Sequence, residues 1–183
     1  MPVRFDVIGN ALDFLQSAAD NLAVFENSSN PRDIKYGLLH LSAGIELLLK
    51  QRLAQEHWSL VFNDVDKASL AAYESANFTS VAFADSITRV RSVCGVGISS
   101  VHEKSLKGLR RLRNKVEHFS FEVSREEGLS IGARAWSFAL DFMEDQLLGE
   151  LNEAQTQGWE EVKATMLGIQ QFVQQRERDI GGE

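Results

Sequence analysis

Apolar side chains recur every three or four residues along most of the chain, which is the spacing of one face of an α-helix. This periodicity predicts helices over about 5–26, 31–57, 82–94, 100–117 and 124–148, and a last amphipathic stretch from Leu151. Proline occurs only at positions 2 and 31, so no proline interrupts the later helices. We therefore predict an all-α fold, a bundle of five or six helices with one longer loop around residues 58–80.

Capping residues mark three of the predicted helix starts: Asn30-Pro31 with Asp33, Ser100 with Glu103, and Ser124 with Glu127. The centre of the 31–57 segment is apolar on more than one side, which is typical of the central helix of a bundle. Inside the longer loop, we expect residues 58–62 to be extended and residues 67–75 to form a short helix.

The length of 183 residues is that of a single domain. We expect residues 1–148 to form the bundle core, and residues 149–183 to form a C-terminal helix and tail that packs on the bundle or extends a dimer surface. With 44% hydrophobic and 25% charged residues, the composition excludes wholesale disorder. The tryptophans are expected to be core or interface anchors: Trp58, Trp136 and Trp159.

No signal for secretion or for a membrane is visible. The sequence has no run of about 18 apolar residues, and its start lacks a basic segment followed by an apolar one. The single cysteine, Cys94, has no partner within the chain, which favours a reducing compartment. Cys94 also has no basic neighbour in sequence, so we expect a structural thiol. These features together predict a cytoplasmic protein without membrane contact.

The chain is acidic overall, with a formal net charge of −7, but its basic residues are concentrated. The segment 104–115 contains six basic residues and no acidic one, whereas the rest of the chain carries thirteen basic against twenty-six acidic residues. A polyanionic partner should therefore meet the protein at this segment.

The helix predicted over 100–117 divides its side chains between faces. Four apolar residues form a stripe that is expected to pack inward: Leu109, Leu112, Val116 and Phe119. A polar face carries three residues spaced four apart: Arg110, Asn114 and His118. Between the two faces lie Arg113 and Glu117. One helical end thus presents a guanidinium, an amide, a carboxylate and an imidazole.

Arginine and histidine in this arrangement suit phosphodiester cleavage by a ribose 2′-hydroxyl. The imidazole can move a proton near neutral pH, and the guanidinium can stabilise developing negative charge on the phosphate. Because the nucleophile belongs to the substrate, we expect no metal and no cofactor; the four histidines also lack the usual ligand spacings. The same residues are also typical of a solvated helix end, where a histidine interacts favourably with the helix dipole.

The stretch Arg113-Asn-Lys-Val-Glu-His118 resembles the Arg-polar-x-x-x-His motif of HEPN domains, the higher eukaryotes and prokaryotes nucleotide-binding family. The flanking Leu-Arg-Arg-Leu and Phe suit the same context. In addition, Ala43-Gly-Ile-Glu-Leu-Leu-Leu-Lys50 resembles the family's second helix, where a polar residue interrupts an apolar run. The resemblance covers about residues 5–148 in helix order.

The resemblance implies a helical bundle that forms homodimers, with two copies of the motif in one cleft. It further implies a metal-independent endoribonuclease of a bacterial defence or toxin–antitoxin system, with an antitoxin or a nucleotidyltransferase as protein partner. Arg113 and His118 would be the catalytic pair, and Asn114 would support them. A toxin subgroup has a tyrosine two residues after the histidine; because this chain has Ser120 there, regulation through that tyrosine is not implied.

Further residues are expected to assist this site. RNA or phosphate contacts are predicted for four basic residues: Lys107, Arg110, Arg111 and Lys115. Positioning roles are predicted for three others: Glu46, Lys50 and Glu117. The four-residue spacing of Glu46 and Lys50 also allows a purely structural ion pair. Two alternatives remain open, a non-catalytic module that binds RNA, a nucleotide or a protein, and a purely structural helical dimer.

Overall fold

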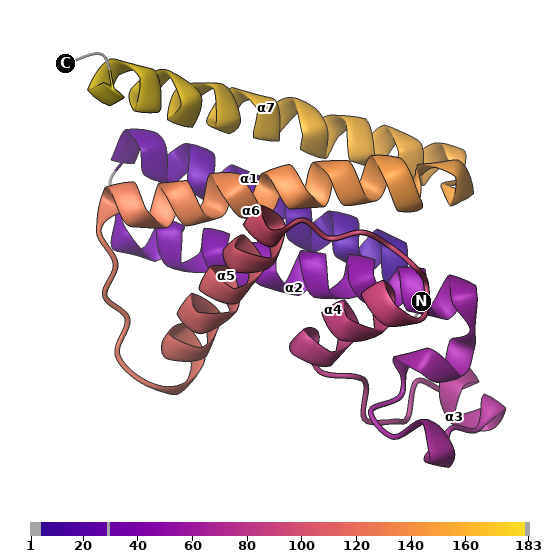
Figure 1. Cartoon of the computed structure of the whole chain (residues 1–183). Coiled ribbons are helices and arrows are strands. Elements are labelled where there is room, and N and C mark those ends of the chain that lie inside the picture. Colours follow the sequence, from indigo (N-terminus) through magenta and orange to yellow (C-terminus); the bar gives the residue numbers. More distant parts are fainter. Residues whose placement is uncertain (1–4, 29, 182–183) are drawn as a thin grey trace, which may run out of the picture.

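The computed structural model describes residues 5–28 and 30–181, with residues 170–173 and 175–181 described by their backbone alone. Its α-helices are α1 (Val7–Ser28), α2 (Pro31–Glu56), α3 (Leu70–Glu74), α4 (Phe83–Ser92), α5 (Ser100–His118), α6 (Arg125–Gln146) and α7 (Glu153–Gly181) (Figure 1). Within these residues the pairing of extended backbone is limited to one isolated bridge, between Phe62 and Ser80. The predicted all-α bundle is confirmed: six longer helices and the short α3 make up the described fold.

Helices α1 and α2 form an antiparallel pair because their apolar faces meet closely. At Gly37 and Gly44 of α2, a Cβ atom would lie 2.6 Å from Leu22 Cγ and 2.7 Å from Leu15 Cγ of α1. The two glycines are seven positions apart, two helical turns on one face, and they let the backbones approach. Leu15 and Leu22 are fully buried in this contact.

Helix α2 is the centre of the bundle, as its apolar circumference predicts. It contacts α1, α4, α5 and α6, which surround it in Figure 1. The cap at its start is also confirmed, because the Asn30 side chain accepts a hydrogen bond from the Arg32 amide and Pro31 occupies the first helical position. The central position of α2 allows it to contribute residues to a site shared with α1 and α5.

The segment between α2 and α4 differs from its prediction. Residues 58–61 form a 3-10 turn rather than an extended piece, and the expected 67–75 helix is reduced to α3. The side chain of Arg89 in α4 holds this segment by donating hydrogen bonds to three backbone carbonyls, those of Leu60, Phe62 and Asn63. A long-range contact of this kind overrides local periodicity.

The start of α5 corrects a second prediction. Ser99, not Ser100, is the N-cap, and its hydroxyl accepts a hydrogen bond from the His102 amide at 3.1 Å. Glu103 does not complete a capping box, because its carboxylate pairs with Arg91 at 2.9 Å and with Lys107 at 2.7 Å. At α6, by contrast, Ser124 caps as predicted.

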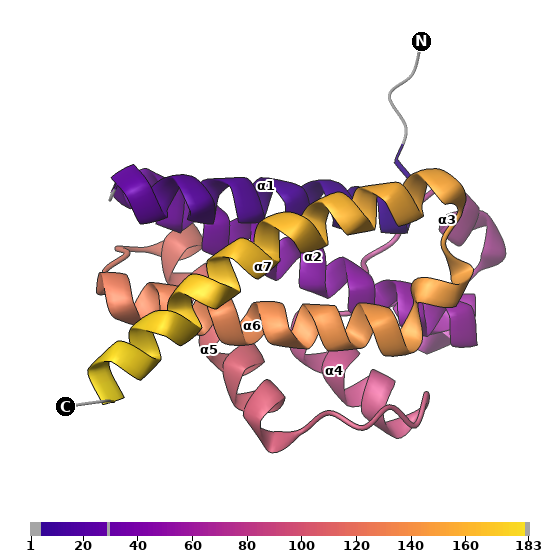
Figure 2. The same ribbon diagram turned by 90° about the horizontal axis from the view of Figure 1, so that it is seen from above.

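Helix α7 crosses over α1 and α6 on the side of the bundle away from α5 (Figure 2). Its inward face buries four apolar side chains: Trp159, Val162, Met166 and Ile169. Val173 continues the same helical spacing, and it lies outside the side chains that the structure describes. The C-terminal helix therefore packs on the bundle. No helix among the described residues has the length and apolarity that crossing a membrane requires.

Candidate nucleic-acid site

The last two turns of α5 bring Arg113, Glu117 and His118 together. A single carboxylate oxygen of Glu117 (Oε2) lies 3.1 Å from Arg113 Nε and 3.9 Å from His118 Nε2. The His118 side chain is 75% exposed, and those of Arg113 and Glu117 are 36% and 30% exposed. The carboxylate therefore pairs with Arg113 and lies near the imidazole of His118, which is open to an incoming ligand.

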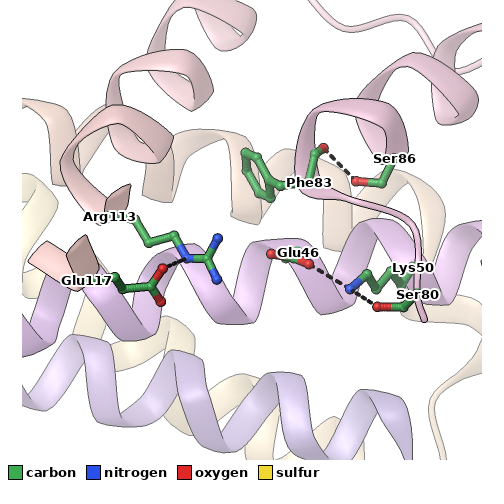
Figure 3. A network of polar contacts seen from close by, with 7 residues as sticks. All are labelled: Glu46, Lys50, Ser80, Phe83, Ser86, Arg113 and Glu117. Carbon is green, nitrogen blue, oxygen red and sulfur yellow. Dashed lines mark hydrogen bonds and ion pairs between the residues drawn. The ribbon is translucent and has the colours of Figure 1, made fainter. Parts of the chain in front are cut away.

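Beside this cluster lies a cavity of about 390 Å³ between α1, α2 and α5. Arg113 and Glu117 form its α5 wall, and its polar lining from α2 comprises three residues: His40, Glu46 and Lys50. Figure 3 shows the Arg113 guanidinium over α2, between Glu117 and Glu46 in this view. Charged groups of both signs thus meet in one partly enclosed space.

Glu46 and Lys50 form the expected ion pair. Lys50 Nζ donates to Glu46 Oε1 at 2.6 Å and to Ser80 Oγ at 2.9 Å, and the side chains of the pair are only 13% and 18% exposed for Lys50 and Glu46 (Figure 3). This geometry confirms the ion pair that the four-residue spacing allows. Glu46 shares the cavity with Arg113, and the two residues have no direct hydrogen bond in the part of the chain that the structure describes. A positioning role for Glu46 and Lys50 stays a prediction.

The predicted inward stripe of α5 holds for most of its length and fails at its end. Leu109 and Leu112 are buried and Val116 is half-buried, whereas the Phe119 side chain is 88% exposed. The helix ends at His118, and Phe119 has extended backbone angles (φ −157°, ψ −151°) that turn its side chain away from the stripe. The prediction for Phe119 was wrong because it extended helical geometry past the last helical residue.

The other residues predicted for the site lie on the exposed surface of α5. Arg110, Asn114 and Lys115 are exposed, and no side-chain hydrogen bond joins Asn114 to Arg113 or His118 among the described residues. Lys107 and Arg111 face α6 instead, on the edge of α5 opposite Arg113. The structure therefore divides the basic segment between two surfaces.

His40 belongs to the cavity and was not singled out from the sequence. Its Nδ1 atom lies 2.9 Å from Ser17 Oγ, and burial lowers the pKa of the imidazole, an effect that Asp13 opposes by charge. The spacing of His40, Ala43 and Leu47 places His40 on the same face of α2 as the rest of the lining. This helical spacing could have indicated that His40 shares a face with the other α2 residues of the cavity. It could not predict that α5 packs beside that face.

Metal binding and a cysteine nucleophile have less support in the structure. Among the described residues, no group of three or more histidine, cysteine, aspartate and glutamate side chains could hold a metal ion. Burial raises the pKa of the Cys94 thiol, which disfavours the thiolate a nucleophile needs. Trp136 and Trp159 are buried, as predicted for core anchors.

Comparison with known proteins adds no assignment: no family model, no curated protein and no solved structure matches the chain.

Proposed function

We propose that this chain is a metal-independent endoribonuclease of the HEPN type, with Arg113 and His118 as its catalytic residues. The observation that carries the proposal is the proximity of the two groups at the end of α5, where Glu117 Oε2 lies 3.1 Å from the Arg113 guanidinium and 3.9 Å from the exposed imidazole of His118. The resemblance of 113–118 to the HEPN motif supports the same assignment.

The proposed reaction is an internal transesterification. The ribose 2′-oxygen attacks the adjacent phosphorus, the bond from phosphorus to the 5′-oxygen breaks, and a 2′,3′-cyclic phosphate and a 5′-hydroxyl form. An imidazole such as that of His118 takes the 2′-hydroxyl proton or supplies one to the leaving 5′-oxygen. The Arg113 guanidinium stabilises the negative charge that develops on the phosphate oxygens. Glu117 positions both groups, and Asn114 supports them.

The resemblance extends the proposal to a homodimer in which two copies of the Arg113–His118 pair share a cleft. Phe119 follows His118 directly and is 88% exposed, so it is available to such an interface. Sedimentation velocity should therefore show a dimer that Phe119→Glu weakens. A bacterial defence or toxin–antitoxin setting, in the cytoplasm and with an antitoxin or nucleotidyltransferase partner, belongs to the same proposal.

RNA cleavage in the presence of EDTA tests the function. A single-stranded RNA with fluorophores at both ends is incubated with wild type, Arg113→Ala and His118→Ala. Each substitution should lower the cleavage rate by about a hundredfold or more, the usual contribution of a general acid–base group or a charge-stabilising donor. Arg32→Ala and His57→Ala, both outside the site, are the matched controls and should cleave as wild type does.

Equal activity in wild type and both site variants would assign the cleavage to another residue or to a contaminating nuclease. RNA binding by all proteins without any product would replace the enzyme by the non-catalytic binding module. Thermal unfolding of each variant is measured in parallel, so that loss of fold is not mistaken for loss of chemistry.

A further inference from the structure

The opposite edge of α5 borders a second concavity, which we call the basic groove. It has a volume of about 480 Å³ and lies between α5 and α6. Its lining includes four cationic side chains and no carboxylate: Lys104, Lys107 and Arg111 from α5, and Arg134 from α6. Between these cations the lining is apolar or small: Val101, Ser105, Gly108 and Ile131.

The cations of the basic groove are only partly neutralised. Lys107 pairs with Glu103 at 2.7 Å, outside the groove, and keeps a side chain that is 67% exposed. Arg134 donates to the neutral Ser130 hydroxyl at 2.6 Å. Lys104 and Arg111 are exposed and have no ion pair within the described residues. In a chain of net charge −7, such a local excess of positive charge favours an anionic ligand.

The groove leads along α5 to His118. Lys104, Arg111 and His118 are spaced seven residues apart, so their backbone positions follow one face of the helix with a rise of about 10 Å between neighbours. From the end of this row the His118 ring reaches round to lie 3.9 Å from Glu117 Oε2, beside Arg113. Lys115 lies one turn before His118, close to the same line, and is exposed. A row of positive groups about 20 Å long therefore ends at the proposed catalytic imidazole.

We propose that the basic groove binds the phosphodiester backbone of single-stranded RNA and guides it to His118. The inference rests on the proposed function for its endpoint, and it assigns Arg134 of α6 a role that neither the motif nor the basic segment specifies. A single row of cations matches the single row of phosphates on one strand, and electrostatic grooves of this kind bind strands with little sequence preference.

RNA binding by cleavage-blocked protein tests the groove separately from the chemistry. Fluorescence anisotropy measures the affinity of a labelled single-stranded RNA for His118→Ala alone, and for His118→Ala combined with Lys104→Gln, Arg111→Gln and Arg134→Gln. The matched control combines His118→Ala with Arg32→Gln, Lys35→Gln and Lys67→Gln, which remove the same charge from exposed or half-exposed positions outside the groove.

The groove variant should bind RNA at least tenfold more weakly than the matched control at low salt. Its plot of log affinity against log salt should also be shallower by about two, since each lost contact to a single strand removes about 0.7 from the slope. Equal affinities in groove variant and control, or absence of binding by His118→Ala itself, would overturn the inference.

The two proposals fail differently in this design. The three groove substitutions are also made in a protein that keeps His118. If this protein and wild type cleave subsaturating RNA equally fast, the groove proposal is wrong and the proposed enzymatic function stands. If no protein cleaves RNA but the groove variant alone loses affinity, the groove stands and the catalytic assignment is wrong.

Discussion

The two edges of α5 carry similar residues in opposite electrostatic settings. On the edge facing α2, Arg113 is paired with Glu117 and shares a cavity with the Glu46–Lys50 pair. On the edge facing α6, the lining of the basic groove contains cations and no carboxylate. One helix therefore presents a balanced, internally bonded surface and an unbalanced cationic one.

This difference suits the two edges to different roles, one to positioning a reacting group and the other to binding a charged chain. A paired guanidinium is held in one orientation, which suits a reaction that needs a defined geometry at a single phosphorus atom. Exposed, unpaired cations attract a charged chain at longer range and tolerate variation in its position. An excess of unpaired cations thus predicts a binding surface, whereas ion-paired side chains predict a positioning role. The following variants test that distinction.

Among the variants that test this comparison, the largest effect should follow from Glu117→Gln, which removes the carboxylate beside Arg113 and His118. We expect kcat for RNA cleavage to fall by up to about a hundredfold because Arg113 and His118 lose their common orientation. KM should stay within about twofold, since the substitution removes no positive charge. Glu56→Gln breaks an arginine–glutamate pair of the same 3.1 Å length in α2 and is the control. An unchanged kcat would show that Glu117 does not position the pair.

Lys50→Met tests the balanced edge through stability. It leaves the Glu46 carboxylate largely buried without its cation, and we expect the free energy of unfolding to fall by about 1–3 kcal/mol. In Lys67→Met, which breaks an ion pair whose lysine side chain is 82% exposed, the expected loss is clearly smaller because water screens the pair. Urea unfolding compares them, and equal losses would contradict a special role for burial at this edge.

Ser99→Ala tests the cap that supports both edges of α5. The substitution removes the hydroxyl that accepts a hydrogen bond from the His102 amide, which should lower the free energy of unfolding by about 1 kcal/mol. Ser100→Ala should change it little, because Ser100 is the first helical residue and not the cap. A larger effect at Ser100 in thermal or urea unfolding would restore the capping box that the sequence suggested.

The smallest effect should come from His40. Because burial lowers the pKa of His40 in the folded chain, the unfolded chain binds this proton first as the pH falls. Stability from the neutral imidazole is present above about pH 6.5 and declines as the pH falls toward the folded pKa. His40→Gln should make the loss of stability between pH 7 and pH 5 less steep in urea unfolding. Identical slopes would exclude this contribution.

The spacing of apolar residues and the capping residues predicted most of the helices, because a helix in a bundle must bury one apolar face. The periodicity of 31–57 specified the central helix, and Asn30 and Ser124 marked real caps. Adjacent serines before α5 left the cap ambiguous, since either hydroxyl could accept a bond from the helix. The exposure of Phe119 followed from where the helix ends, a boundary that periodicity locates poorly.

The sequence predicted only part of the candidate site, chiefly the residues that lie within α5. Arg113, Glu117 and His118 lie within one helix, so spacing alone brought them together. His40 and Arg134 enter through contacts between helices that are far apart in sequence, and nothing local encodes those contacts. Local spacing therefore grouped the candidate residues, and tertiary packing supplied the cavity and the groove around them.

The chemistry of the product ends is the most direct test of the central claim. RNA and a matched strand with 2′-O-methyl riboses are incubated with wild type and His118→Ala in EDTA, and the ends are identified by mass spectrometry. We predict 2′,3′-cyclic phosphate and 5′-hydroxyl ends from wild type, with the methylated strand intact and His118→Ala nearly inactive. Cleavage of the methylated strand, or full activity of His118→Ala, would contradict the account.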